Sequence, residues 1–169
     1  NGHLNSFGFL KKRLMHIFLY ASMTRALTKQ EILKLGGEPS WGVAPANPFG
    51  SSVRKISGVG GDRIMVRNKF HFTSSLEASD RDVERTVRDH DRSFQRRFPM
   101  LTDVQMEYRW GGRLCLSWNG VPVFGEIENG LFAACCQNGL GASKGTLAGI
   151  LVAEYASGVQ NSYIEDYLN

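Results

Sequence analysis

The stretch that decides the fold lies near the C-terminal end, at residues 131–158: LFAACCQNGLGASKGTLAGILVAEYASG. Its first six residues are apolar and follow the turn dipeptide Asn129-Gly130, so they predict a short buried strand. Residues 146–157 are apolar on nearly every face and end before Gly158, as expected for a helix buried between layers. The stretch therefore predicts a strand, a glycine loop and a helix in succession.

The glycine loop has the features of a ligand site. A strand that enters a helix through glycines leaves backbone N–H groups at the positive end of the helix dipole. Gly139 and Gly141 permit positive φ and the approach of a flat ligand, and Gly145 and Gly149 permit close packing of the helix on the sheet. The loop is not a dinucleotide fingerprint, because the third glycine of G-x-G-x-x-G would fall at Lys144. On the glycines alone, a ligand loop and simple tight packing are equally good interpretations.

The residues upstream of this stretch predict an α+β fold, an antiparallel or mixed β-sheet with flanking helices. A helix is expected to begin at Thr28, which forms a Thr-x-x-Glu capping box with Glu31. The proline-containing segment 41–50 is expected to be an edge strand or a loop. Buried or alternating patterns predict strands at residues 15–22, 52–57, 63–67, 69–73 and 104–110, the last broken at Gly111-Gly112 and resumed after it.

A long amphipathic helix is expected over residues 79–98. Ser79 can cap it, and its apolar face carries Val83, Val87, Phe94 and Phe98. The opposite face is rich in arginine among acidic residues, which is typical of a solvated face with i,i+3 and i,i+4 ion pairs.

Composition and charge exclude several classes of protein. The chain has 169 residues, 42% apolar and 21% charged, as is usual for one globular domain, and no apolar run near the length of a membrane span. Residues 1–113 carry 19 basic and 11 acidic side chains (+8), whereas residues 114–169 carry one and five (−4). Because the basic charge forms no continuous stripe, we expect no nucleic-acid partner.

The cysteines and histidines predict neither a disulfide framework nor a metal site. Cys115, Cys135 and Cys136 are odd in number, and two of them are adjacent. The four histidines are scattered singly, without metal-ligand spacing. These features agree with a reducing, cytoplasmic setting.

Two further motifs precede the glycine loop: RWGGR at residues 109–113 and NGVPVFG at residues 119–125. In this order and spacing, the three motifs resemble the C-terminal half of the FAD-dependent amine and amino-acid oxidases of the D-amino-acid oxidase family. The residues of these motifs are most similar to those of the γ-glutamylputrescine oxidase-like branch, and the resemblance covers nearly the whole chain.

The resemblance implies that two segments of the chain have different functions. Residues 1–130 would form a substrate-binding β-sheet lobe, and residues 131–169 would form the strand, loop and helix that complete the FAD site. Members of the family begin with a Rossmann loop that has no counterpart here. The chain is therefore expected to be a C-terminal fragment, with the N-terminal FAD domain as its missing partner.

The resemblance also assigns roles to individual residues. The flavin pyrimidine edge would contact Gly139, Leu140, Gly141, Ala142, Ser143 and Lys144. Lys144 is either part of that positive field or a solvated lysine. Arg113 would bind a substrate carboxylate or form an ordinary ion pair, Trp110 would line the substrate site or fill core, and Tyr20 would shape the pocket or pack within its strand. Cys115 matches the position at which some sarcosine oxidases tether their flavin, but non-covalent FAD is expected.

The implied function is oxidation of a C–N bond in a small-molecule amine or amino acid. A hydride would pass to flavin N5, the imine would hydrolyse, and oxygen would yield hydrogen peroxide. No catalytic base is identified. The alternative is a non-catalytic, stand-alone binding or interaction domain derived from such an enzyme. Neither the amine nor the oligomeric state is indicated by the sequence.

Overall fold

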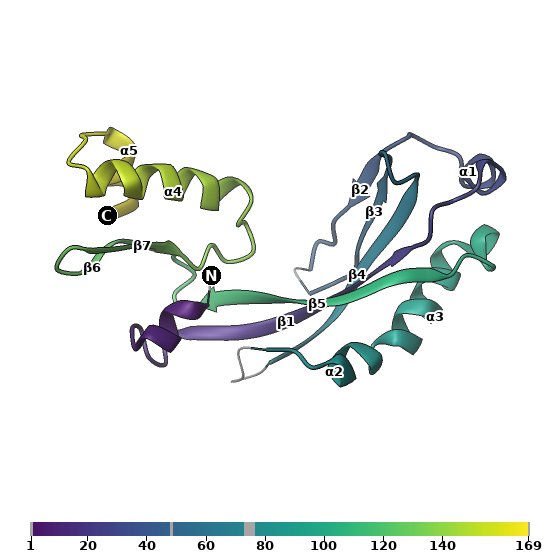
Figure 1. Ribbon diagram of the computed structural model, residues 1–169, viewed down its shortest axis with the longest axis horizontal. Helices are drawn as coiled ribbons and strands as arrows, with labels where there is room; N and C mark the ends of the chain where they lie inside the picture. Colours follow the sequence, from purple (N-terminus) through teal and green to yellow (C-terminus); the bar gives the residue numbers. More distant parts are fainter. Residues whose placement is uncertain (1, 48, 73–76, 169) are drawn as a thin grey trace. The chain divides into compact units, whose positions relative to one another are not determined.

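The computed structural model describes residues 2–47, 49–72 and 77–168, which form helices and a mainly antiparallel sheet (Figure 1). The strands are β1 (Leu14–Thr24), β2 (Trp41–Val43), β3 (Ser52–Ile56), β4 (Arg63–Phe72), β5 (Met106–Ser117), β6 (Val123–Glu128) and β7 (Leu131–Cys135). The helices are α1 (Lys29–Leu35), α2 (Asp80–Glu84), α3 (Val87–Arg97), α4 (Ser143–Ala156) and α5 (Ser162–Leu168), with short 3-10 helices at His3–Phe7 and Pro99–Leu101. None of the helices in the described ranges is long and apolar enough to cross a membrane.

Five strands form one sheet in the order β2-β3-β4-β1-β5, and β6 and β7 form a separate hairpin. The pairs β2–β3 and β3–β4 are antiparallel, with Val53 opposite Val66. The proline-flanked segment supplies β2 at an edge of the sheet, because proline cannot donate to a central ladder. The predicted combination of an antiparallel sheet with helices is confirmed.

Two compact units divide the chain. The first unit comprises Asn1–Ile17, Phe72–Leu76 and Arg113–Asn169, and the second comprises Phe18–His71 and Glu77–Gly112. These units are defined by contacts between residues. The predicted boundary at residue 130 is instead a functional one, between a substrate lobe and a flavin loop. The division at residue 130 therefore stays a prediction.

The core of the second unit lies between its sheet and α3. Its buried members come from alternate positions of β3 and β4, from one face of α3, and from the chain around them: Leu27, Val53, Ile64, Val66, Phe94, Phe98, Leu101 and Val104. Phe94 and Phe98 are one helical turn apart, with ring centroids 5.1 Å apart. Burial of this apolar set fixes α3 on the sheet.

Strand β4 is longer than the sequence predicts. The two strands expected at 63–67 and 69–73 are one continuous strand through Phe72, and residue 73 lies outside the described residues. Lys69 adopts φ +63°, which places one irregular residue in the strand without ending it. The chain has no glycine or proline at this point that would force a turn.

The helix expected over residues 79–98 is divided in two. Ser79 caps α2 as predicted, its hydroxyl oxygen accepting the N–H of Asp82. The break falls at Arg85 and Thr86, where the N–H and the hydroxyl of Thr86 both donate to the carbonyl of Val83. Such a side-chain bond competes with the helical ladder, so α3 begins as a new helix.

The ion pairs around these helices also differ from the expectation. Arg85–Asp82 is an i,i+3 pair of the predicted kind. Two carboxylates of α3 pair with strands instead: Asp89 with Lys69 of β4, and Asp91 with Arg109 of β5. These charges therefore also fasten the helix to the sheet.

Strand β5 continues through Gly111 and Gly112, where a break was predicted. An added Cβ at Gly111 would lie 3.1 Å from Cε1 of Tyr20 and 3.3 Å from Cβ of Ala78. The glycine at 111 thus permits close approach of the Tyr20 ring, rather than a turn.

Candidate functional site

The glycine loop connects β7 to α4 in the first unit (Figure 1). The N–H of Leu140 donates to the carbonyl of Gln137 (3.0 Å), which closes a turn. Gly139 has φ +91°, a region that favours glycine. Gly141 has no such φ, and an added Cβ there would meet nothing within 4 Å in the described residues. Positive φ, expected at both glycines, is therefore confirmed at Gly139 and wrong at Gly141.

The end of this loop exposes backbone donors at the start of a helix. Within the described residues, the N–H groups of Gly141, Ala142 and Ser143 have no acceptor, and α4 has no side-chain cap. The N–H groups of Lys144 and Gly145 are already used, by the carbonyls of Leu140 and Gly141. Three exposed donors at the positive end of a 14-residue helix attract an anionic or electron-rich group. The exposed side chain of Lys144 adds positive charge there.

Asn138 holds the loop in place, a role that the sequence analysis missed. Its Oδ1 accepts the N–H of Ser117 at 2.9 Å, and its Nδ2 donates to the carbonyl of Gly120 at 2.9 Å. Asn138 also has φ +50°, which asparagine tolerates better than most residues. An asparagine directly before the loop glycine was the available signal.

Gln137 is buried beside the same loop. It is 4% exposed, and neither atom of its carboxamide has a hydrogen-bond partner within the described residues. Its Cγ lies 3.6 Å from the position of a Cβ at Gly145. Gly145 therefore faces this side chain in ordinary contact.

Helix α4 was expected to be buried on nearly every face. It is buried along one stripe only. It lies over the β6–β7 hairpin (Figure 1), where Ala148 and Leu151 are buried. Leu147 and Ile150 are 44% and 54% exposed. An added Cβ at Gly149 would meet nothing within 4 Å of the described chain, so the expected close packing there is wrong.

The C-terminal end of α4 agrees with the prediction. Gly158 has φ +74° and donates its N–H to the carbonyl of Tyr155, while Val159 donates to that of Glu154. This pair of bonds is a Schellman motif, which ends a helix at glycine.

Arg113 lies on β5 in the first unit, beside two histidines. Its Nη1 is 3.0 Å from Nε2 of His3. His16 is buried nearby, and burial together with the Arg113 charge lowers the pKa of His16. A Cβ at Gly2 would lie 2.5 Å from the His16 ring, so only glycine fits at residue 2 without a shift. The guanidinium is half-buried, and its own charge and planar fork suit a carboxylate ligand.

Tyr20 and Trp110 belong to the second unit and differ in exposure. Trp110 is 39% exposed, whereas Tyr20 is 2% exposed and packs under Gly111. The Tyr20 hydroxyl lies 2.7 Å from Nδ1 of His71, and the two rings are stacked with centroids 5.5 Å apart. Burial, and then the charge of Asp82, raise the pKa of Tyr20. His71 was missed because its position on β4 becomes meaningful only when β4 lies beside β1.

A second buried polar group was also missed. Ser22 Oγ is 2.6 Å from Nδ1 of His90, and both side chains are fully buried. Nε2 of His90 lies 3.1 Å from the carbonyl of Asn68, which can only accept, so Nε2 carries the proton and Nδ1 accepts from Ser22. Arg109 donates to Ser22 and forms the ion pair with Asp91. The signal was the spacing of Thr86, His90 and Phe94, which places all three on one helical face.

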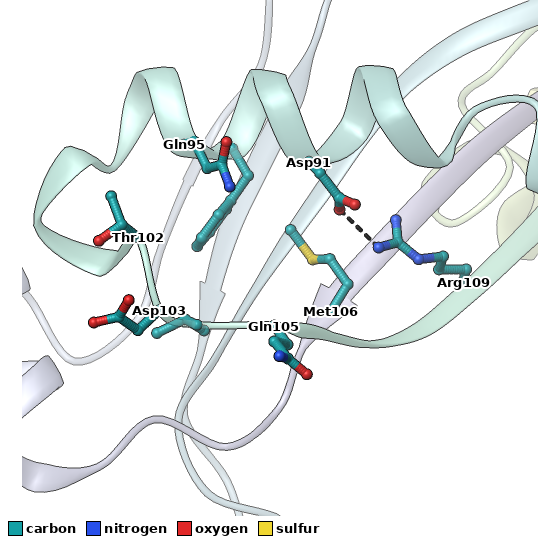
Figure 2. A pocket seen from close by; sticks show the side chains of 9 residues that line it. Asp91, Gln95, Thr102, Asp103, Gln105, Met106 and Arg109 are labelled. Atoms are coloured by element: carbon teal, nitrogen blue, oxygen red, sulfur yellow. Dashed lines mark hydrogen bonds and ion pairs between the residues drawn. The ribbon is translucent and has the colours of Figure 1, made fainter.

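This polar group adjoins a cavity of about 580 Å³ on the second unit. Figure 2 shows the Asp91–Arg109 pair at one end, with Met106 beside it and polar side chains such as Gln95 and Asp103 farther along. Its lining residues are Asp91, Phe94, Gln95, Thr102, Asp103, Val104, Gln105, Met106 and Arg109. It contains none of the predicted site residues. No three potential metal-ligating side chains gather anywhere in the described ranges.

Comparisons with known proteins find one matching family and two similar oxidoreductases. The profile of the family described as FAD dependent oxidoreductase matches residues 10–155. The chain is 34% identical over 96 residues to gamma-glutamylputrescine oxidoreductase of Escherichia coli (strain K12), covering 57% of this chain and 22% of that protein. It is 30% identical over 92 residues to the probable oxidoreductase OrdL of Haemophilus influenzae, covering 54% of this chain and 20% of that protein.

A solved structure extends the likeness to the fold. The crystal structure of glycine oxidase from Geobacillus kaustophilus superposes with a TM-score of 0.62 and 19% identity, covering 94% of this chain and 39% of that one. In the two curated relatives described above, the segment that matches this chain is about a fifth of the full length.

Proposed function

Because the chain belongs to the family of FAD-dependent oxidoreductases, we propose that it forms part of an enzyme that oxidises a C–N bond of an amine or amino acid. One observation carries the proposal: the exposed glycine loop presents, at the start of α4, three N–H groups that have no acceptor among the residues that the structure describes. The cofactor of the family is FAD, whose flavin ring has an electron-rich edge of carbonyl and ring nitrogen atoms. The donor set of the loop fits such an edge.

The loop would hold the flavin through its backbone. The N–H groups of Gly141, Ala142 and Ser143 and the dipole of α4 would stabilise negative charge at the pyrimidine edge. Lys144 would add to the same field, and Gly139 keeps the backbone in the conformation that turns it into the helix. When bound, FAD supplies the electron acceptor for the oxidation. On this proposal, residues 131–169 contribute the flavin loop and residues 1–130 the substrate lobe.

Three residues on the sheet are each proposed to contribute to substrate binding. Arg113 would bind a carboxylate through its guanidinium fork, which matches a carboxylate in two parallel hydrogen bonds. Tyr20 would shape the substrate pocket, with its hydroxyl fixed by His71. Trp110 presents an exposed aromatic surface that suits the apolar part of an amine. No catalytic base is assigned.

The full-length gene product tests the proposal. After purification, its visible spectrum should show the flavin band, or the band should appear when FAD is added and excess cofactor is removed. Addition of amines and amino acids in the absence of oxygen should then bleach the band for at least one compound. A protein that binds no FAD would contradict the proposal and favour a non-catalytic binding domain.

A further inference from the structure

Two of the three cysteines meet in a small apolar core of the first unit. Cys115 lies on β5, and Cys136 directly follows β7, 21 residues later in the chain. Their Sγ atoms are 3.5 Å apart, and both side chains are fully buried. Leu14 is the third buried member of this core. A disulfide requires the two sulfur atoms to approach from this contact to about 2.05 Å, with no other group between them.

The backbone selects Cys136, and not its neighbour, for this contact. Cys136 has φ +57°, an uncommon conformation for a residue with a side chain. It directly follows β7 and begins the segment that leads into the glycine loop. Cys135 lies one residue earlier on β7 and is half-buried. The chain therefore contains a matched pair of adjacent thiols, one in the sulfur contact and one outside it.

The contact also makes the two thiols unequal. The S–H of Cys136 donates toward Cys115 Sγ, and this hydrogen bond lowers the pKa of Cys115 and raises that of Cys136. The thiolate is the form that attacks an oxidant. This difference favours Cys115 as the attacking sulfur, and Cys136 is the thiol in contact with it.

We propose that Cys115 and Cys136 form a redox-active dithiol that a hydroperoxide converts to a disulfide. In the first step, Cys115 sulfur attacks one oxygen of hydrogen peroxide, the O–O bond breaks, and a sulfenic acid and one water form. In the second step, Cys136 sulfur attacks the Cys115 sulfur, its proton goes to the leaving hydroxide, and a second water forms. Two thiols and one peroxide thus give one disulfide and two waters, with two electrons passing from sulfur to oxygen.

The disulfide would act on the segment that enters the glycine loop. Cys136 is followed directly by Gln137 and by Asn138, which already fastens the loop to Ser117 and Gly120. A covalent bond to β5 would add a second attachment on the same segment. Oxidation is therefore expected to slow amide hydrogen exchange in residues 136–145. The inference does not rest on the proposed function, since the peroxide is added in the test.

The experiment maps sulfur linkage in the full-length gene product. The protein is treated with hydrogen peroxide, remaining thiols are alkylated under denaturing conditions, and the chain is cut after glutamate. Cleavage after Glu126 and Glu128 separates Cys115 from the other two cysteines, so the two peptides remain joined only through a disulfide. The expected product is a joined pair, lighter than the two free peptides by two hydrogen atoms.

The adjacent cysteine provides the control. The joined pair should form in Cys135→Ala as in the unaltered protein, and should be absent in Cys136→Ala and Cys115→Ala. If a variant fails to fold, the linkage in the unaltered protein is still assigned by fragmentation of the joined peptides. Linkage through Cys135, or recovery of all three cysteines as alkylated thiols or sulfinic acids, would overturn the inference.

Discussion

Gly111 determines how closely strand β5 approaches Tyr20. Its missing side chain leaves the space in which the Tyr20 ring packs, and that packing directs the hydroxyl to His71. Gly112, the next residue, meets nothing within 4 Å of the described chain. Packing thus requires glycine at position 111 but not at position 112, so Gly112 provides a matched control for a substitution at Gly111.

We expect Gly111→Ala to destabilise the protein and Gly112→Ala to have little effect. The new methyl at 111 would crowd Tyr20 and Ala78, and overpacking of this kind costs about 1–3 kcal/mol. The exposed site at 112 should stay within about 0.5 kcal/mol. Thermal unfolding of the full-length protein measures both variants, and equal melting temperatures for the two would contradict the packing argument.

Arg113 supports a prediction about substrate preference. If it binds a carboxylate, Arg113→Met should raise KM roughly 10- to 100-fold for an amino-acid substrate, since a charge-assisted hydrogen-bond pair contributes about 1.5–3 kcal/mol. The matching amine without the carboxylate should show an unchanged KM. Steady-state kinetics with the two compounds provides the comparison, and an equal rise for both would assign Arg113 a structural role.

At the scale of elements, local signals were predictable and contacts between distant residues were not. The Thr28–Glu31 capping box and the Gly158 helix end are confirmed, because each depends on atoms within a few residues. The division of the long helix at Thr86 was not predicted, since one hydroxyl bond decides it. The Tyr20–His71 and Ser22–His90 pairs join residues 51 and 68 positions apart, so only the assembled sheet brings them together.

The glycine loop yields a prediction at this scale. Gly139→Ala should weaken FAD binding about 5-fold, because the free loop would relax away from φ +91° and regaining that conformation on binding costs about 1 kcal/mol. Gly141→Ala changes the same loop without that backbone cost and meets open space within the described residues. Quenching of FAD fluorescence measures both affinities. A larger loss at 141 than at 139 would indicate that the bound flavin, and not backbone strain, selects the glycines.

For the whole molecule, buried histidines make stability depend on pH. Burial lowers the pKa of His90, and the charge of Arg109 acts in the same direction. The neutral ring accepts from Ser22 and donates to Asn68, so a second proton on the ring would displace the Ser22 bond. The folded state therefore binds fewer protons than the unfolded state below the ordinary pKa of 6.5.

Stability should accordingly be full above about pH 6.5 and fall as the pH drops toward the lowered pKa of His90. Replacement by glutamine keeps a donor for Asn68 but removes the titration, so His90→Gln should lower the melting temperature at neutral pH and flatten its decline between about pH 7 and 5. His16, whose pKa is also lowered by burial, should account for the slope that remains. Melting curves of His90→Gln, His16→Gln and the double variant across this range separate the two contributions, and an unchanged slope in the double variant would mean that neither buried ring controls the acid sensitivity of the fold.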